Sequence, residues 1–282
     1  MIGRRLATLA AAIATTALGP GPALAGAAAP ATEPPHGIPV NCAARSYSVS
    51  SAGRLYRVVM RSGYLRTWDI EQRSLSVWPR HVAQSSATWT GDGTTTKQLA
   101  VDDRGRVFVW TQWLSDQDDT GRYAMRRVPG DWSSTRALTA SRTYYYRLAG
   151  RHLVRYEIAP GGAPVRGRVI RWSTLADVKT MSLDRSTPWA DTVIATTTKG
   201  ELLQVKVRRD STATVTRTTL RRTGYQNFVT FASGRCIERP RAGAYLGVTR
   251  IGGVYGYYDP DRTDARASFS GGRIGSWRHW TY

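Results

Sequence analysis

The chain lacks the sequence motifs of the common enzyme classes. It contains no G-x-S-x-G, no H-E-x-x-H, no phosphate-cradling glycine loop and no dinucleotide fingerprint, which argues against serine hydrolases, zinc peptidases and nucleotide-binding enzymes. After the first 25 residues no window has a helical period, so we expect almost no helix. No other stretch approaches the ~20 apolar residues that span a bilayer. We expect no enzymatic activity, no cofactor and no bound metal.

The one long apolar stretch lies at the N-terminus. Arg4 and Arg5 precede the apolar run LATLAAAIATTAL, and Ala23-Leu24-Ala25 gives an A-x-A cleavage signal. We predict a signal peptide over residues 1–25 and an extracellular, secreted protein. Residues 26–40 are rich in Ala, Pro and Gly and predict a linker, so the folded domain is expected over residues 41–282.

Acidic residues are scarce. Twenty Asp and Glu stand against forty Lys and Arg, which gives a formal net charge of +20, and nearly all the basic residues are arginine. Outside a cell such a surface favours anionic wall polymers, acidic glycans or phospholipid head groups. An arginine-rich composition is also typical of a GC-rich genome, in which Arg replaces Lys on any solvated surface. Charge alone therefore leaves both interpretations open.

Cysteine is nearly absent as well. The only two cysteines, Cys42 and Cys236, belong to a chain expected in an oxidising compartment, so we predict that they form a disulfide. Two unpaired buried thiols are the alternative. No second Cys or His lies at metal-ligand spacing from either residue.

What the sequence does contain is a repeated strand–turn–strand phrase. It begins at Leu55, Gln98, Tyr144, Val193 and Tyr245, and its turn glycines are expected at Gly63, Gly105, Gly150, Gly200 and Gly253. Glycine suits such turns because they need φ > 0. The flanking runs are rich in Tyr, Val, Leu, Ile and Thr, as strands prefer.

Weaker apolar segments flank each hairpin and predict about four antiparallel strands per unit of roughly 45–50 residues. A single four-stranded sheet cannot bury both of its faces, so the units are expected to pack radially. The predicted fold is an all-β, five-bladed β-propeller that acts as a monomer. A β-sandwich is the structural alternative. Residues 275–282 or 45–50 could supply the strand that closes the ring.

These features resemble the tachylectin-type five-bladed propeller lectins. The family's linker phrase I-G-x-G-W-x-N-F is matched by RRTGYQNF at 221–228 and by RIGSWRHW at 273–280, and the resemblance covers about 240 residues. It implies shallow sites between blades that bind N-acetylated amino sugars. At the other linkers this chain has TWTGDGTTT, DWSSTRAL and WSTLADVKT, which departs from the family and puts repeated sugar sites in doubt.

A sugar-binding site combines an aromatic ring, on which the sugar packs, with carboxylate or amide groups that form hydrogen bonds with the sugar. The residues that match the linker phrase, and three aromatic–acid pairs that follow turn glycines, are the candidates: Tyr225, Gln226, Asn227, Trp277, Trp68, Asp69, Tyr156, Glu157, Tyr258 and Asp259. The aromatics could equally pack the sheets while the acids cap strand ends. On the sugar-binding interpretation the protein is a lectin for glycans that contain amino sugars.

Two other functions compete with the lectin. A basic scaffold would bind anionic wall polymers or a partner protein through Arg221, Arg222, Arg235, Arg239 and Arg241, because guanidinium groups match phosphate and carboxylate geometry. Nucleic acid is not expected as a partner. A propeller glycoside hydrolase would use paired carboxylates such as Asp102, Asp184 and Asp191, although nothing in the sequence separates them from turn aspartates.

Overall fold

The computed structural model describes residues 35–49, 55–69, 77–89, 91–115, 121–170, 175–264, 266 and 268–277. In these ranges the chain forms nineteen β-strands and one short 3-10 turn, η1 (Pro35–Gly37). The prediction of an all-β fold with almost no helix is confirmed. The predicted signal peptide and the linker up to residue 34 lie outside the described residues. No helix found in the described part is long and apolar enough to cross a membrane.

Three of the sheets each contain four antiparallel strands in chain order. The first sheet consists of β4 (Pro79–Trp89), β5 (Gly93–Asp102), β6 (Arg106–Ser115) and β7 (Gly121–Asp131). The second consists of β8 (Thr135–Ala140), β9 (Tyr144–Ala149), β10 (His152–Ile158) and β11 (Pro164–Ile170). The third consists of β12 (Val178–Ser186), β13 (Ala190–Thr197), β14 (Leu202–Arg208) and β15 (Val215–Arg221).

The fourth sheet has seven strands and joins the two ends of the folded part. Its order is β19-β18-β17-β16-β1-β2-β3. The strands are β1 (Cys42–Val49), β2 (Leu55–Arg61), β3 (Tyr64–Asp69), β16 (Phe228–Cys236), β17 (Gly243–Thr249), β18 (Gly253–Asp259) and β19 (Ser270–Ser276). β1 and β16 pair at Cys42↔Cys236 and Ala43↔Arg235, and a disulfide links the two cysteines, as predicted.

The prediction of five four-stranded blades is wrong. The described strands form four sheets because β1 and β16 hydrogen-bond to each other and merge the first and last groups of strands into one sheet. The first predicted hairpin is also not equivalent to the others. Its turn at Gly63 lies beside Cys42, whose carbonyl accepts from the Ser62 N–H, whereas the turn between β17 and β18 lies at the opposite end of the same sheet.

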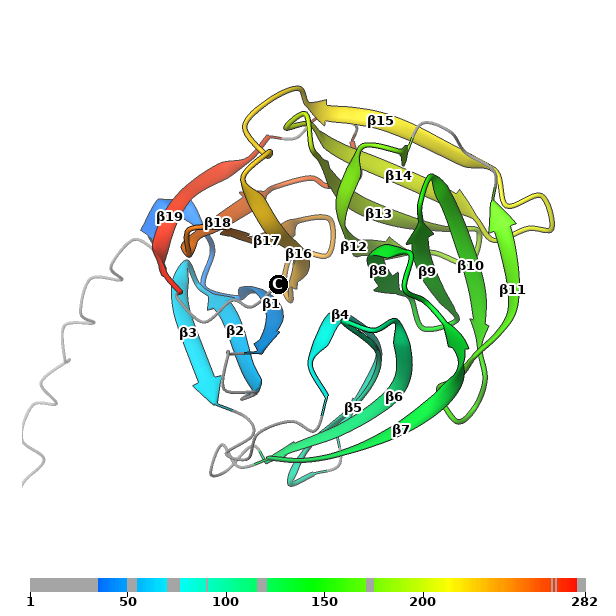
Figure 1. Ribbon diagram of the computed structural model, residues 1–282. Helices are drawn as coiled ribbons and strands as arrows, with labels where there is room; N and C mark the ends of the chain where they lie inside the picture. The colour runs from blue at the N-terminus through cyan, green and yellow to red at the C-terminus, as the bar shows by residue number, and fades with distance from the viewer. Residues whose placement is uncertain are drawn as a thin grey trace, which may run out of the picture. The chain divides into compact units, whose positions relative to one another are not determined.

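The sheets are arranged around a common centre, as in a β-propeller (Figure 1). Five strands, β1, β4, β8, β12 and β16, line a central cavity of about 540 Å³. The innermost strands of neighbouring sheets lie side by side, because the Leu183 N–H donates to Thr139 Oγ1 (2.8 Å) and the Ser233 N–H donates to Ser182 Oγ (2.8 Å). The fold is therefore a propeller, with sheets of unequal size.

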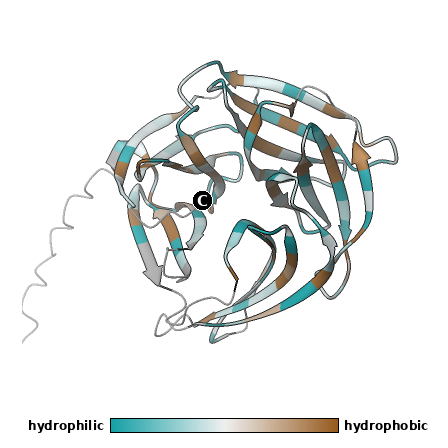
Figure 2. Cartoon of the chain, viewed as in Figure 1, coloured by the Kyte–Doolittle hydropathy of each residue, from teal (hydrophilic) through white to brown (hydrophobic). Residues whose placement is uncertain are grey.

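The core lies between the sheets. Strands in the middle of a sheet are buried on both faces, as all eight residues of β13 are. The outer strand β11 is largely exposed, and the residues of the outer strand β15 are exposed or half-buried. Figure 2 shows hydrophobic segments interspersed with hydrophilic ones along the strands of every sheet. Separate apolar clusters fill the spaces between β4–β7 and β8–β11, between β8–β11 and β12–β15, and between β12–β15 and β16–β19. Each sheet thus buries faces that it could not shield alone.

Turn glycines hold one end of the propeller together. Gly105, Gly200 and Gly252 have positive φ, and their carbonyls accept from the backbone N–H of Trp132 (2.8 Å), Tyr225 (3.0 Å) and Trp277 (2.7 Å), respectively. The last turn glycine is thus Gly252, and the predicted Gly253 is a strand residue. We call this the linker end, because the chain crosses here to the next sheet, and we call the opposite end, with Cys42–Cys236, the disulfide end.

Candidate functional site

The central cavity is basic. Arg45 comes from β1, Arg80 from β4, Arg136 from β8 and Lys179 from β12, and no Asp or Glu occurs among the described residues that line the cavity. Like charges that converge in one cavity repel one another, and a bound anion would relieve this repulsion. The cavity therefore favours an anionic ligand.

Two of these four cations are fixed by backbone carbonyls, all of which except that of Gly150 lie at the start of the next sheet. Arg136 donates to the carbonyls of Gly150 (2.9 Å), Ala176 (2.7 Å) and Val178 (2.7 Å). Lys179 donates to the carbonyl of Gln226, and burial lowers the pKa of its ammonium group. These bonds hold the positive charges in place and also join neighbouring sheets.

His81 also lies in the cavity lining. Burial, together with the positive charge of Arg80, lowers the pKa of its imidazole to about 4, so the ring is neutral at pH 7. Its Nε2 is buried and has no hydrogen-bond partner among the described residues. At neutral pH the charge of the lining therefore comes from the arginines and the lysine.

A second set of cations lies at the linker end. The turns that join the second and third strands of successive sheets each carry one exposed basic residue next to or near the turn glycine: Arg104, Arg151, Lys199 and Arg250. Their turns border the inner strands, because the Gly150 N–H donates to the Ser134 carbonyl (3.3 Å) and the Arg250 N–H to the Asn227 carbonyl (3.2 Å). We call these four residues the turn cations. Our sequence prediction missed them, although a basic residue near the glycine in four successive hairpins was the available signal.

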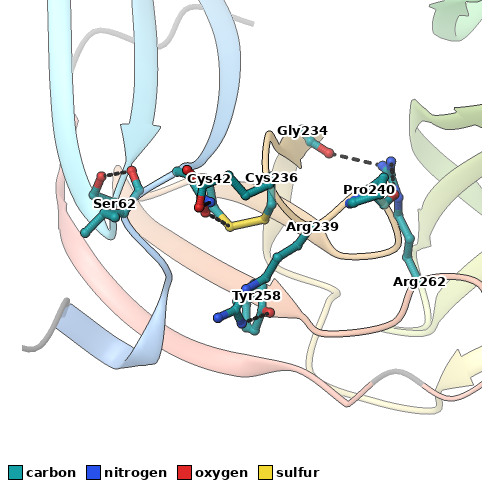
Figure 3. Close-up of a disulfide and its surroundings, with 11 residues drawn as sticks. Cys42, Ser62, Gly234, Cys236, Arg239, Pro240, Tyr258 and Arg262 are labelled. Atoms are coloured by element: carbon teal, nitrogen blue, oxygen red, sulfur yellow. Dashed lines mark hydrogen bonds between the residues drawn. A yellow bond between two sulfur atoms is a disulfide. The ribbon is translucent and has the colours of Figure 1, made fainter.

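The five arginines predicted to bind anions divide between the two ends. Arg221 ends β15 and Arg222 follows it at the linker end, and both are exposed. Arg235, Arg239 and Arg241 are exposed at the disulfide end. There Arg239 donates to the Tyr258 hydroxyl (3.0 Å), as Figure 3 shows, and Arg241 forms an ion pair with Asp261. The structure thus does not bring these five residues together.

The residues of the linker phrase lie partly in the core. Tyr225 is buried among Phe228, Phe231 and Tyr257, and burial raises the pKa of its hydroxyl to about 12. Trp277 packs edge-on against Tyr56 (5.0 Å between ring centroids), and its Nε1 donates to Ser48 Oγ (3.0 Å). Gln226 and Asn227 are exposed. The ring of Tyr225 thus fills space between two sheets, and the ring of Trp277 packs between the two ends of the seven-stranded sheet.

The aromatic–acid pairs occupy unlike surroundings. Tyr156 packs against Trp132 (4.8 Å between ring centroids), while Glu157 forms a partly exposed ion pair with Arg166 (3.1 Å). Tyr258 and Asp259 are both buried. The backbones of Trp68 and Asp69 belong to β3, and their side chains lie outside the described part. No shared pattern of stacking and hydrogen bonding joins the pairs that the structure describes.

The buried carboxyl of Asp259 gives a pH prediction. Burial raises its pKa from 3.8 to about 6, and the nearby Asp264 and Asp184 add to the shift. Between these pH values the folded protein holds a proton that the unfolded chain has lost, so the free energy of unfolding falls as the pH rises from 4 to 6. A shift of one pKa unit corresponds to ~1.4 kcal/mol. The expected fall in the free energy of unfolding is about 1–2 kcal/mol, less than the full shift would give. Asp259→Asn removes this component from the pH profile of urea unfolding, and an unchanged profile would contradict the assignment.

The three carboxylates considered for glycoside hydrolysis serve separate turns and contacts between sheets. Asp102 accepts from the backbone N–H of Arg104 (3.0 Å) and Arg106 (2.7 Å). Asp191 accepts from Tyr146 (2.6 Å), Ser186 (2.6 Å) and Arg209 (2.6 Å). Asp184 accepts from Ser233 (2.7 Å) and Tyr245 (3.2 Å), and burial raises its pKa. None of the three lines the central cavity.

Comparison with known proteins gives only distant likenesses. No family model and no curated protein matches the sequence. AofleA from Arthrobotrys oligospora is 8% identical with a TM-score of 0.45, and the alignment covers 83% of this chain and 70% of that one. The WD40 domain of Pan2 from Neurospora crassa is 13% identical with a TM-score of 0.31, over 66% of this chain and 49% of that one. The chain thus spans about half the length of the Pan2 domain.

A putative 6-phosphogluconolactonase from Bacteroides uniformis is 10% identical with a TM-score of 0.39, and the alignment covers 82% of this chain and 72% of that one. At this level of similarity no activity is transferred from these proteins. The propeller assignment rests on the sheets and the cavity that they surround, and the narrower resemblance to tachylectin-type lectins stays a prediction.

Proposed function

We propose that the protein is a non-catalytic binding propeller that holds anionic polymers, such as wall polymers or acidic glycans outside the cell, on its linker end. The observation that carries this proposal is the repetition of an exposed cation in four successive turns at that end. Arg221 and Arg222 add further charge there.

The spread of these charges favours an extended ligand. The turn cations belong to four different turns around the central cavity, so a small anion could contact only a few of them at once. A polyanion that crosses the linker end could contact several, and each contact would release counterions into the solution. Several weak contacts on one chain add up to tight binding.

The test is salt-dependent retention on immobilised poly(glycerol phosphate). Neutralising the turn cations in the variant Arg104→Gln/Arg151→Gln/Lys199→Gln/Arg250→Gln should lower the salt concentration of elution. It should also reduce the slope of log K against log salt by about 0.7–0.9 for each lost phosphate contact, the range measured for nucleic acids. All four side chains are exposed, so the variant is expected to fold.

The matched control removes the same charge from the disulfide end, in Arg61→Gln/Arg235→Gln/Arg239→Gln/Arg241→Gln, where all four side chains are exposed. This variant should elute nearly as the parent does. If both variants lose retention equally, binding depends on net charge alone and the assignment to the linker end is wrong.

Amino-sugar binding is the second candidate function. It is favoured by the exposure of Gln226 and Asn227 and by the hydrogen bond from the Gly224 N–H to Gln226 Oε1 (3.2 Å), which orients the amide of Gln226. On this proposal free N-acetylglucosamine elutes the protein from an amino-sugar polymer and salt does not. Retention on poly(glycerol phosphate) that N-acetylglucosamine leaves unchanged would favour the polyanion instead.

A further inference from the structure

Beyond polymer binding, we propose that the central cavity is a separate site for a compact phosphate dianion, either free or as the monoester of a sugar. The four basic side chains in its lining come from four different strands, and the described lining holds no carboxylate to neutralise them. A cleft lined by charges of one sign concentrates ligands of the opposite sign, and a compact dianion brings two negative charges into one small space.

Arg45 and Arg80 would make the primary contacts. Both are exposed and line the cavity, and neither forms an ion pair with any residue that the structure describes. Their strands β1 and β4 are in contact, because the Tyr47 hydroxyl donates to Gln84 Oε1 (3.4 Å). Arg45 lies on the disulfide-end side of this contact and Arg80 on its linker-end side, so the two arginines face the cavity at different depths. Guanidinium groups match phosphate oxygens with two parallel hydrogen bonds, so each of these two arginines is suited to a phosphate group in the cavity.

Arg136 and Lys179 would supply fixed positive charge. Arg136 is held by three carbonyls, so its position costs no further ordering when a ligand binds. Lys179 gives one hydrogen bond to the Gln226 carbonyl, and an ammonium group has three N–H donors. Arg136 and Lys179 belong to β8 and β12, whereas Arg45 and Arg80 belong to β1 and β4. The central cavity therefore has a basic residue on four of its five lining strands.

The size of the cavity limits the ligand. Its volume of about 540 Å³ lies in the usual range of small-molecule sites, roughly 300–1,000 Å³. A hexose phosphate fits in such a space, whereas an extended polymer does not. A neutral sugar would fit as well but would leave the four charges unrelieved, so we expect discrimination by charge.

Titration calorimetry with glucose 6-phosphate, inorganic phosphate and glucose at constant ionic strength tests the site. Glucose 6-phosphate should bind, and glucose should not. Inorganic phosphate that binds as tightly as glucose 6-phosphate identifies the free ion as the ligand, and weaker binding identifies the monoester. In Arg45→Gln/Arg80→Gln the affinity should fall at least tenfold, while the melting temperature without ligand stays unchanged because both side chains are exposed.

The control variant Arg104→Gln/Arg151→Gln removes the same charge from turn tips at the linker end. It should bind glucose 6-phosphate as the parent does but elute earlier from poly(glycerol phosphate), and Arg45→Gln/Arg80→Gln should show the reverse. The two proposals can therefore fail separately. No heat of binding with either phosphate, or an equal loss in both double variants, would overturn the cavity site.

Discussion

Trp132→Ala is expected to lower the free energy of unfolding by about 3–5 kcal/mol, the usual cost of truncating a buried Trp or Phe. Trp132 is 5% exposed and packs against Tyr156 of the next sheet at 4.8 Å between ring centroids. Arg147 lies over the same ring, with its Cζ 4.8 Å from the centroid. The substitution would leave a cavity between two sheets, where the remaining side chains cannot close the gap without shifting a strand.

Urea unfolding followed by fluorescence measures this loss, and Trp189→Ala is the matched control. Trp189 is 80% exposed in the turn between β12 and β13, so its truncation should change the unfolding free energy by less than about 0.5 kcal/mol. Similar losses in the two variants would mean that Trp132 does not hold the sheets together.

Removal of the disulfide in Cys42→Ala/Cys236→Ala is expected to cost up to about 5 kcal/mol. The bond spans 194 residues, and the chain-entropy model gives values of this order for so long a loop. β1 and β16 share only two paired positions, so little else in their ladder replaces the bond. Gly234 lets the strands approach closely, since a Cβ there would collide with the backbone of Ala43.

Guanidinium unfolding with and without a reducing agent measures this effect. The parent protein should lose stability when it is reduced, and the double variant should be insensitive to reduction. A double variant as stable as the oxidised parent would show that strand pairing alone closes the fold.

The sequence allowed the strands to be predicted but not the way in which they combine. The turns at Gly105, Gly150 and Gly200 are where the strand patterns place them, because local β-propensity and positive φ determine a hairpin. The count of five sheets failed because the pairing of β1 with β16 depends on residues far apart in the chain. The hairpin at Gly63 resembles the others in composition yet lies at the other end of its sheet, and composition carries no information on strand direction.

The candidate site was harder to predict than the fold. Tyr225 and Tyr258 are of the residue type and in the sequence context expected of sugar-binding aromatics, but both are buried. Burial depends on tertiary packing, which a single sequence does not reveal. Arg45 and Arg80 line the same cavity only because the inner strands surround one axis. The strongly basic composition left anion binding open as one of two interpretations, and the structure adds where basic side chains line the cavity and the turns of the linker end.

The pairing of β1 with β16 also sets an order of events during synthesis. At about 5–20 residues per second, roughly 10–40 s separate the appearance of Cys42 from that of its partner 194 residues later. Throughout that interval Cys42 has no partner and the edge of β1 that will pair with β16 stays open, and an unpaired strand edge favours aggregation. The seven-stranded sheet can therefore form only after β16 has been made.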